Sequence, residues 1–225
     1  MKITHPQVLK CLKKNLTSPI LFSLFLLSTQ NSHALTISDL LITEIMANPS
    51  AVTDSNGEWF EIYNPADQAF DFNGISLSDN GSNYHLINQT DPLLIQPGEY
   101  FVFGKNGNEL ENGGYTPDYI YSSFTLGNLD DEIILSDTIG NILSLEYNSG
   151  FAPAGHSMEL TSPDMQLTSY ITTTEFNYGA GDYGTPGSAG SYHFTTNSVS
   201  VPEPPLILLL LTGIIGLRCR QKLRG

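Results

Sequence analysis

The residues best suited to chemistry form an acidic segment in the first third of the chain. Asp54, Asn56 and Glu58 place oxygen-bearing side chains at alternate positions around a glycine turn. Glu61 follows shortly, and Glu44 lies on the preceding predicted strand. Calcium takes about six to eight oxygen ligands and tolerates irregular loops. The pattern therefore predicts a candidate calcium site at Asp54, Asn56, Glu58 and Glu61, which Glu44 would complete.

A second interpretation of these acidic residues needs no ion. Asp and Asn are favoured in turns, and acidic side chains solvate a surface. The candidate segment resembles half of an EF-hand loop, yet it lacks the remaining acidic positions and the flanking helices. Another acidic cluster, at residues 130–132, lies at the start of a later predicted strand. Calcium is thus the one candidate cofactor, and plain solvation is the alternative.

No pattern in the chain predicts a catalytic centre. Residues 155–159 read Gly-His-Ser-Met-Glu, which nearly matches a nucleophile elbow, but the last glycine is replaced and no strand-turn-helix context is predicted. The histidines of the body are widely separated and lack paired metal-ligand spacing. Glu58 and Glu61 could act as the carboxylate pair of a polysaccharide-modifying enzyme. Their side chains diverge on one strand, however, so we expect a non-enzymatic protein.

Aromatic side chains offer a different kind of binding. The chain has 11 Tyr, 11 Phe and one Trp, and tyrosines gather at residues 115–121 and 178–192. Flat aromatic faces can stack on sugar rings. Tyrosine is also a favoured residue in β-sheets, so packing within a sheet is the alternative.

Charge is divided sharply along the chain. Residues 35–200 contain 22 acidic residues and a single basic one, Lys105, which gives a net charge of −21. Such a body repels phosphate backbones, which excludes nucleic acid as a partner. A divalent cation would relieve the repulsion among these acids. Both cysteines, Cys11 and Cys219, lie in the basic end segments, so the body has no disulfide and no cysteine nucleophile.

The body reads as a succession of short strands separated by Gly, Asn, Asp and Pro. This spacing predicts an antiparallel sandwich or barrel with minimal helix, and a hairpin at residues 137–141. Along the second strand Trp59 and Glu61 alternate with Phe60 and Ile62, so we expect one of these sets to face outwards. The expected strands are Leu40–Met46, Glu58–Tyr63, Phe70–Leu77, Tyr84–Ile87, Glu99–Phe103, Tyr119–Phe124, Glu132–Ser136, Ile142–Tyr147 and Ser157–Leu160.

The N-terminal 34 residues have the pattern of a signal peptide. Four lysines precede a short apolar run at residues 20–27, which is too short to span a bilayer. Small residues at Ser32 and Ala34 suit signal peptidase, so we expect cleavage after Ala34.

The C-terminal residues 201–225 have the pattern of a sorting tail, preceded by a flexible Ser/Thr-rich tether at residues 191–200. A short apolar run at residues 206–217 would insert transiently in the membrane, because the basic residues after it stay on the cytoplasmic side. The tail resembles the PEP-CTERM sorting signal, which implies processing by an exosortase in exopolysaccharide-secreting Gram-negative bacteria. The residues that carry this resemblance are Val201, Pro202, Glu203, Pro204, Arg218 and Arg220.

Five motifs of the body, in order, resemble those of the lamin-tail domain. They are residues 42–49, 57–65 with 72–79, 95–102, 155–160 and 184–188. The resemblance covers about residues 35–190 and implies an immunoglobulin-like antiparallel β-sandwich, which makes the chain all-β with apolar helical segments only at the two termini. It implies little about activity, because this fold is found in proteins of several functions.

Three functional interpretations follow from the sequence. The first is an exported surface or extracellular-matrix protein, a non-enzymatic module that binds exopolysaccharide or envelope proteins. The second is a calcium-stabilised adhesive scaffold in the same location. The third is a polysaccharide-modifying enzyme that uses Glu58 and Glu61. All three place the body in the Gram-negative cell envelope or outside the cell, after processing by signal peptidase and exosortase.

Overall fold

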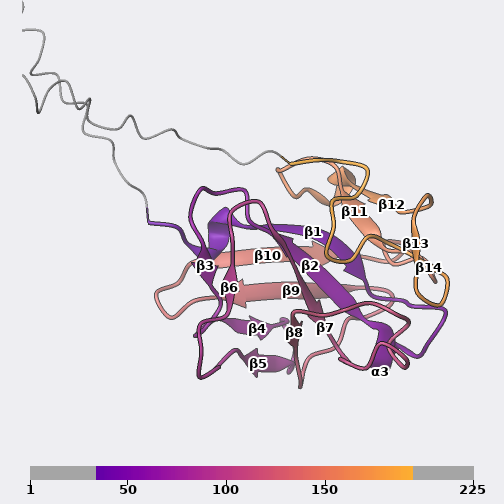
Figure 1. Cartoon of the computed structure of the whole chain (residues 1–225), viewed down its shortest axis with the longest axis horizontal. Helices are drawn as coiled ribbons and strands as arrows, with labels where there is room; N and C mark the ends of the chain where they lie inside the picture. The colour runs from indigo at the N-terminus through magenta and orange to yellow at the C-terminus, as the bar shows by residue number, and fades with distance from the viewer. Residues whose placement is uncertain (1–33, 195–225) are drawn as a thin grey trace, which may run out of the picture. The chain divides into compact units, whose positions relative to one another are not determined.

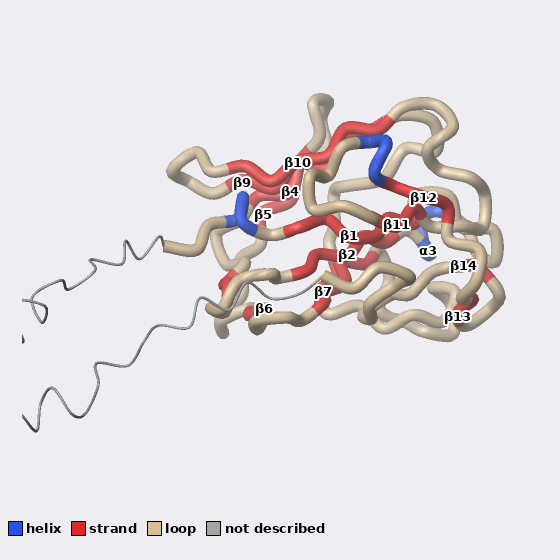
Figure 2. Tube along the Cα trace, turned by 90° about the horizontal axis from the view of Figure 1, so that it is seen from above, coloured by secondary structure: helices blue, strands red, loops and turns tan. Residues whose placement is uncertain are grey.

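The computed structural model describes residues 34–194, which fold into two stacked sheets (Figures 1 and 2). The predicted signal peptide before Ala34, the end of the tether and the sorting tail lie outside the described residues. The six-stranded sheet has the order β12 (Tyr170–Thr172), β11 (Met158–Leu160), β1 (Leu41–Met46), β2 (Trp59–Tyr63), β7 (Tyr100–Gly104) and β8 (Tyr119–Ile120). The four-stranded sheet has the order β10 (Ile142–Tyr147), β9 (Asp131–Ser136), β4 (Ser76–Ser78) and β5 (Tyr84–Leu86).

Smaller elements complete the described residues. All pairs within the two large sheets are antiparallel except β7 with β8. Helix is limited to single turns, which confirms the expected all-β class for the described part of the chain. The short elements are β3 (Phe70–Asp71) paired with β6 (Leu94–Ile95), β13 (Asn177–Tyr178) paired with β14 (Asp182–Tyr183), α3 (Asp54–Gly57), η2 (Ile37–Asp39) and η3 (Leu167–Ser169).

The core lies between the two large sheets. Phe60 of β2 stacks on Phe103 of β7, with ring centroids 4.9 Å apart and both side chains fully buried. Leu135 of β9 closes the core from the other sheet. β10 alternates between exposed and buried positions along its length, as expected for a strand with one face on a core. The hairpin predicted at residues 137–141 is confirmed, since it joins β9 to β10.

The expectation that one side of β2 faces outwards is wrong. All five residues of the strand are buried, Trp59 and Glu61 as fully as Phe60 and Ile62. The reason is a second cover: β13, β14 and the C-terminal strap, which we define as residues 184–194, lie on the face of the six-stranded sheet away from β9 and β10 (Figure 2).

An irregularity in β1 matters for the side chains on this covered face. The register between β1 and β2 shifts between Ile42 and Glu44, so that Ile42 pairs with Ile62 and Glu44 pairs with Glu61. A bulge of this kind adds one residue, here Thr43, to one strand. It lets Ile42 remain in the core while Glu44 points to the covered face.

The predicted strand Phe70–Leu77 is in fact two strands in different sheets. β3 pairs with β6, whereas β4 pairs with β5 and β9. Gly74 lies between them with φ of 87°, a left-handed conformation that favours glycine and turns the chain. The strands β6, β12, β13 and β14, each two or three residues long, were not expected from the sequence.

Candidate functional site

Three buried glutamates lie side by side on the covered face of the six-stranded sheet. Glu44 of β1 is the register partner of both Glu61 of β2 and Glu159 of β11. Their side chains are 1%, 1% and 4% exposed, respectively. We call these three residues the carboxylate row. Neighbouring side chains in such a row have Cβ atoms about 5 Å apart.

Glu44, at the centre of the row, is held from two directions. The hydroxyl of Ser157, next to β11, donates to Glu44 Oε1. Thr185 of the strap donates its backbone N–H to Oε1 over 2.9 Å and its hydroxyl to Oε2 over 2.7 Å. The carboxylate therefore fixes the start of the strap to the sheet.

Glu61 makes the second attachment of the strap. Its Oε2 accepts the backbone N–H of Gly187 over 2.8 Å, and its Oε1 accepts the hydroxyl of Thr43 over 2.7 Å. Thr43 is the extra residue of the β1 bulge, so this irregularity supplies a donor to the row. The strap is also held at its end, where Tyr63 of β2 donates its hydroxyl to the carbonyl of Phe194.

Glu159 makes the third attachment and has one oxygen unused. Its Oε1 accepts the backbone N–H of Tyr192 over 3.1 Å, whereas Oε2 is buried and has no hydrogen-bond partner. The residue lines a cavity of about 10 Å³, together with Glu61, Tyr100 and parts of the strap. This volume has room for about one water molecule. The strap runs so close that a Cβ on Gly190 would overlap the carboxylate of Glu159.

Burial dominates the electrostatics of the row. It raises the pKa of Glu44 from 4.5 to about 7, although the hydrogen bonds from Ser157 and Thr185 act to lower it. Burial also raises the pKa of Glu61 well above its usual range, and the charge of Glu44 adds to this rise. Two charges about 5 Å apart near a protein surface repel by about 3 kcal/mol. Glu44 and Glu61 therefore resist ionising together at neutral pH.

The only lysine or arginine in the described residues lies elsewhere. Lys105 donates its ammonium to the carbonyl of Phe124 and stands 5.5 Å from the ring centroid of Tyr121. Its charge acts on Glu58. The pKa of Glu58 is raised to about 7, because burial outweighs the lowering effects of the hydrogen bond from Leu126 and of the Lys105 charge. No lysine or arginine among the described residues thus compensates the carboxylate row.

The structure does not bring the four predicted calcium ligands together. Each of the four side chains binds a different part of the protein. Asp54 accepts from Asn128 and Asn56 accepts from Asn106, while Glu58 accepts from the N–H of Leu126 and Glu61 belongs to the carboxylate row. Across residues 34–194, no group of three or more His, Cys, Asp or Glu is arranged to hold a metal ion.

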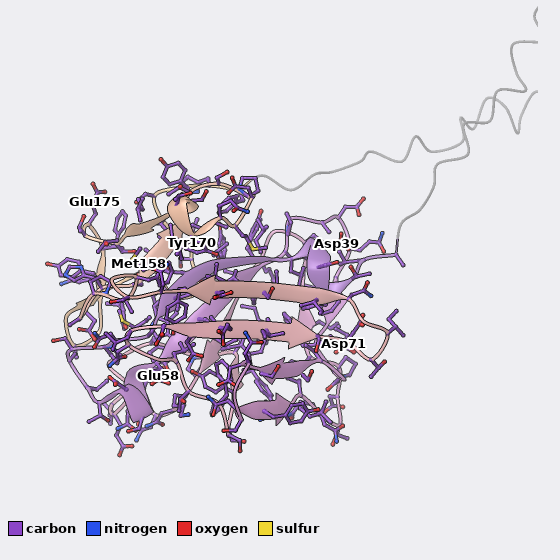
Figure 3. All side chains as sticks on the ribbon, turned by 180° about the vertical axis from the view of Figure 1, so that it is seen from behind. Asp39, Glu58, Asp71, Met158, Tyr170 and Glu175 are labelled. Carbon is purple, nitrogen blue, oxygen red and sulfur yellow. The ribbon has the colours of Figure 1, made fainter. Side chains whose placement is uncertain are left out.

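The segment expected to form the calcium loop is a helical turn, α3, next to Glu58. Glu58 lies at the end of the sandwich opposite Asp39 and Asp71 (Figure 3). Its Oε2 accepts the N–H of Leu126 over 3.0 Å, and Asp131 accepts the N–H of Gly127 over 2.7 Å. These two carboxylates, which the sequence placed in separate acidic clusters, fix the same loop before β9.

The near-match to a nucleophile elbow is a structural segment. Ser157 is fully buried, and its hydroxyl donates to Glu44 and lies 2.8 Å from the hydroxyl of Thr173, so it is not open to a substrate. The ring of His156 stacks on Tyr183 with centroids 4.6 Å apart. This geometry agrees with a turn that leads into β11.

Most of the tyrosines considered for sugar stacking are used in packing. Tyr115, Tyr119 and Tyr121 are 2%, 9% and 2% exposed, so their faces pack inside the protein and are not available to a ligand. Tyr115 and Tyr178 surround the chain's single tryptophan, Trp59, whose indole N–H donates to the hydroxyl of Tyr178 over 2.9 Å. These side chains serve packing beneath the strap.

Sequence reasoning missed the carboxylate row as a unit. Glu44, Glu61 and Glu159 each stand within a run of apolar residues in a predicted strand. A charged residue at such a position is rarely buried unless it is paired. That pattern was the available signal, but the strap donors that bind Glu44 and Glu61 lie more than 100 residues away, in a segment with no regular pattern.

Comparisons with known proteins address the family and nothing finer. Within the described residues, no helix is long and apolar enough to cross a membrane. Neither the curated proteins nor the solved structures contain a match to the chain. The model of the Lamin Tail Domain family matches residues 33–149, and the sandwich of two mainly antiparallel sheets agrees with its immunoglobulin-like fold. The chain therefore belongs to the lamin tail domain family.

Proposed function

We propose that this protein is a non-enzymatic structural or binding module that acts at the bacterial cell surface or in the extracellular matrix. The non-enzymatic role is supported by what the buried carboxylates bind. Glu44 and Glu61 accept backbone N–H groups of the strap, and Glu58 accepts that of Leu126. They therefore stabilise the fold instead of facing an open cleft.

The size of the carboxylate-lined cavity supports the same proposal. At about 10 Å³ it holds about one water molecule, whereas small-molecule sites have volumes of roughly 300–1,000 Å³. A glycan-active enzyme needs its two carboxylates on either side of a sugar ring. Glu58 and Glu61 bind different segments, which speaks against the use of this pair in polysaccharide hydrolysis.

The location outside the cell rests on the sequence. We infer that residues 1–34 direct export and are removed after Ala34, and that residues 201–225 are a sorting tail processed by an exosortase. The single lysine and 22 acidic residues of positions 35–200 are compatible with a hydrated extracellular matrix. Exopolysaccharide and other envelope proteins are the two ligand classes proposed for the module. Among the described residues, the aromatic side chains available to contact them are Tyr84, Phe176 and Tyr192, which are 56%, 48% and 47% exposed.

Export and sorting are tested together in an exopolysaccharide-secreting Gram-negative host that carries an exosortase. The full chain is expressed, the cells are fractionated, and the ends of the protein are read by mass spectrometry. We expect a mature N-terminus at Leu35 and a protein outside the cytoplasm. A variant with Pro202→Ala and Glu203→Ala should retain its tail, while Glu146→Gln serves as a matched control. An intact chain in the cytoplasm would refute the proposed location.

The non-enzymatic part is tested with the same purified protein. We expect no product from purified exopolysaccharide, and retention of the polysaccharide or of an envelope protein on the immobilised protein. Turnover that disappears in Glu58→Gln or Glu61→Gln, but persists in Glu146→Gln, would instead assign the protein to the polysaccharide-modifying enzymes.

A further inference from the structure

The carboxylate row and the C-terminal strap form a unit whose charge is not balanced by the protein. Three carboxylates adjoin one another in register, each at most 4% exposed. One oxygen, Glu159 Oε2, is buried without a partner and lines the water-sized cavity. An ionised carboxylate without a partner is costly to bury. Something must therefore neutralise the row while the strap covers it.

The groups around the row do not supply a positive charge. Thr43 of β1, Ser157 before β11 and Thr185 of the strap contribute neutral donors. Tyr100 of β7 lines the cavity, and the charge of Glu61 helps to raise the pKa of this phenol to about 12, after the larger effect of burial.

The other titratable neighbours of the row carry no lysine or arginine charge either. Tyr178 of β13 lies close enough for the charge of Glu44 to help raise the pKa of its phenol, after the larger effect of burial, and Tyr192 of the strap lines the cavity. Tyr63 of β2 donates to the carbonyl of Phe194, and His156 uses its Nδ1 with the carbonyl of Thr173. His193 of the strap is exposed. None of these groups is a lysine or an arginine.

A bound metal is not the arrangement that the structure favours. Within residues 34–194 no set of three or more acidic, histidine or cysteine side chains is arranged to hold one. Instead, each glutamate of the row accepts at least one hydrogen bond from a donor of the strap. Protons are the remaining means of neutralising it.

We propose that the carboxylate row is a proton-dependent latch for the strap: carboxyl protons shared in the row keep residues 184–194 docked on the sheet, and ionisation releases them while the sandwich stays folded. The strap is the natural part to move, because residues 184–194 contain no strand. Besides the row and Tyr63, its attachments within the described residues are the hydrogen bond from the N–H of Gly184 to the carbonyl of Phe176 and the packing of Phe194 against the core. Release would uncover the β1–β2–β11 face and lengthen the segment between the module and the tail. This inference concerns the module itself and goes beyond its proposed location and ligands.

The direction of the pH dependence follows from linkage. The docked state binds protons more tightly than the released state, in which the glutamates meet water. Docking is therefore strongest below about pH 4.5, weakens as the pH rises towards 7, and is weakest in alkaline solution. For Glu44 alone, the difference between 4.5 and about 7 corresponds to a loss in docking on the order of 10²-fold.

Trp59 is a built-in reporter of this change. It is the only tryptophan of the chain, it is fully buried, and its indole donates to Tyr178. A Cβ on Gly184, the first residue of the strap, would lie 3.0 Å from the indole ring. Movement of the strap should therefore change the fluorescence of Trp59, with a red shift as water reaches the ring.

The test uses the full chain purified in a mild detergent, followed from pH 5 to pH 9. Hydrogen exchange of strap peptides, normalised to the intrinsic rate at each pH, should rise on the order of 10²-fold. Exchange of β9 and β10 peptides should stay unchanged, and Trp59 emission should follow the strap. Glu61→Gln should keep the strap docked to higher pH, whereas Glu146→Gln, exposed on β10, should behave as the wild type.

Each other outcome would overturn the proposal. If normalised strap exchange does not depend on pH, the row is not a latch. If β9 and β10 lose protection together with the strap, the change is global unfolding. If EDTA releases the strap at pH 5, or calcium alone keeps it docked at pH 9, the row holds a cation instead of protons. If a Gln variant fails to fold, the pH titration of the wild type still tests the latch, because exchange of the β9 and β10 peptides distinguishes release of the strap from global unfolding.

Discussion

Replacement of Glu58 by glutamine should remove a large part of the pH dependence of global stability. Glu58 is 3% exposed, and its pKa is raised from 4.5 to about 7, mainly by burial. At about 1.4 kcal/mol for each pH unit, this difference corresponds to about 3 kcal/mol. The folded protein holds the proton more tightly, so the contribution is full below about pH 4.5 and is lost as the pH rises towards 7 and slightly beyond.

The assay is chemical unfolding followed by circular dichroism at pH 4 and at pH 8.5. Between these values the wild type should lose about 3 kcal/mol more of its free energy of unfolding than Glu58→Gln. In a thermal melt this difference amounts to about 6–12 °C for a domain of this size. The glutamine retains an oxygen to accept the N–H of Leu126, and Glu146→Gln should leave the pH dependence unchanged. Parallel curves for the wild type and Glu58→Gln would refute the reasoning.

Three further predictions concern packing, the loop before α3 and calcium. Leu135→Ala should lower the free energy of unfolding by about 2–5 kcal/mol in urea titrations, because it leaves a cavity between the sheets. Asp182→Ala should lower the free energy of unfolding by about 1–3 kcal/mol in total, since this 4% exposed carboxylate accepts the N–H groups of Ser50 and Ala51. Millimolar calcium should not raise the melting temperature relative to EDTA at equal ionic strength, whereas a site filled at about 100 times its Kd would add about 2.7 kcal/mol.

The sandwich could be predicted because its core depends on local alternation. In β10 every second residue is apolar and buried, and the hairpin to β9 follows from a turn-rich segment of five residues. The same reasoning placed β1, β2 and β7 within one residue of their observed starts. Patterns of this kind are short-range, so a single sequence is enough to find them.

The second cover of the six-stranded sheet could not be predicted in this way. The strap is rich in Gly and Ser and has no apolar period that would reveal a buried face. Its contacts are hydrogen bonds to Glu44 and Glu61, across more than 120 residues of chain. Alternation along β2 then suggested an outward face, because a strand with polar and apolar sides usually has one side in water. The acidic loop was misleading because Glu58 and Glu61 are only three residues apart in sequence but bind separate parts of the fold.

The packed unit extends well beyond the residues that match the family. The match ends at residue 149, yet Glu44 binds Ser157 and Thr185, and Glu61 binds Gly187. A chain ending at 149 would keep both carboxylates but lose these donors, and it would expose the covered face of β2. Because water would solvate both glutamates on that open face, the segment after 149 is what buries these two acidic residues and raises their pKa. The strap and the carboxylate row therefore depend on one another.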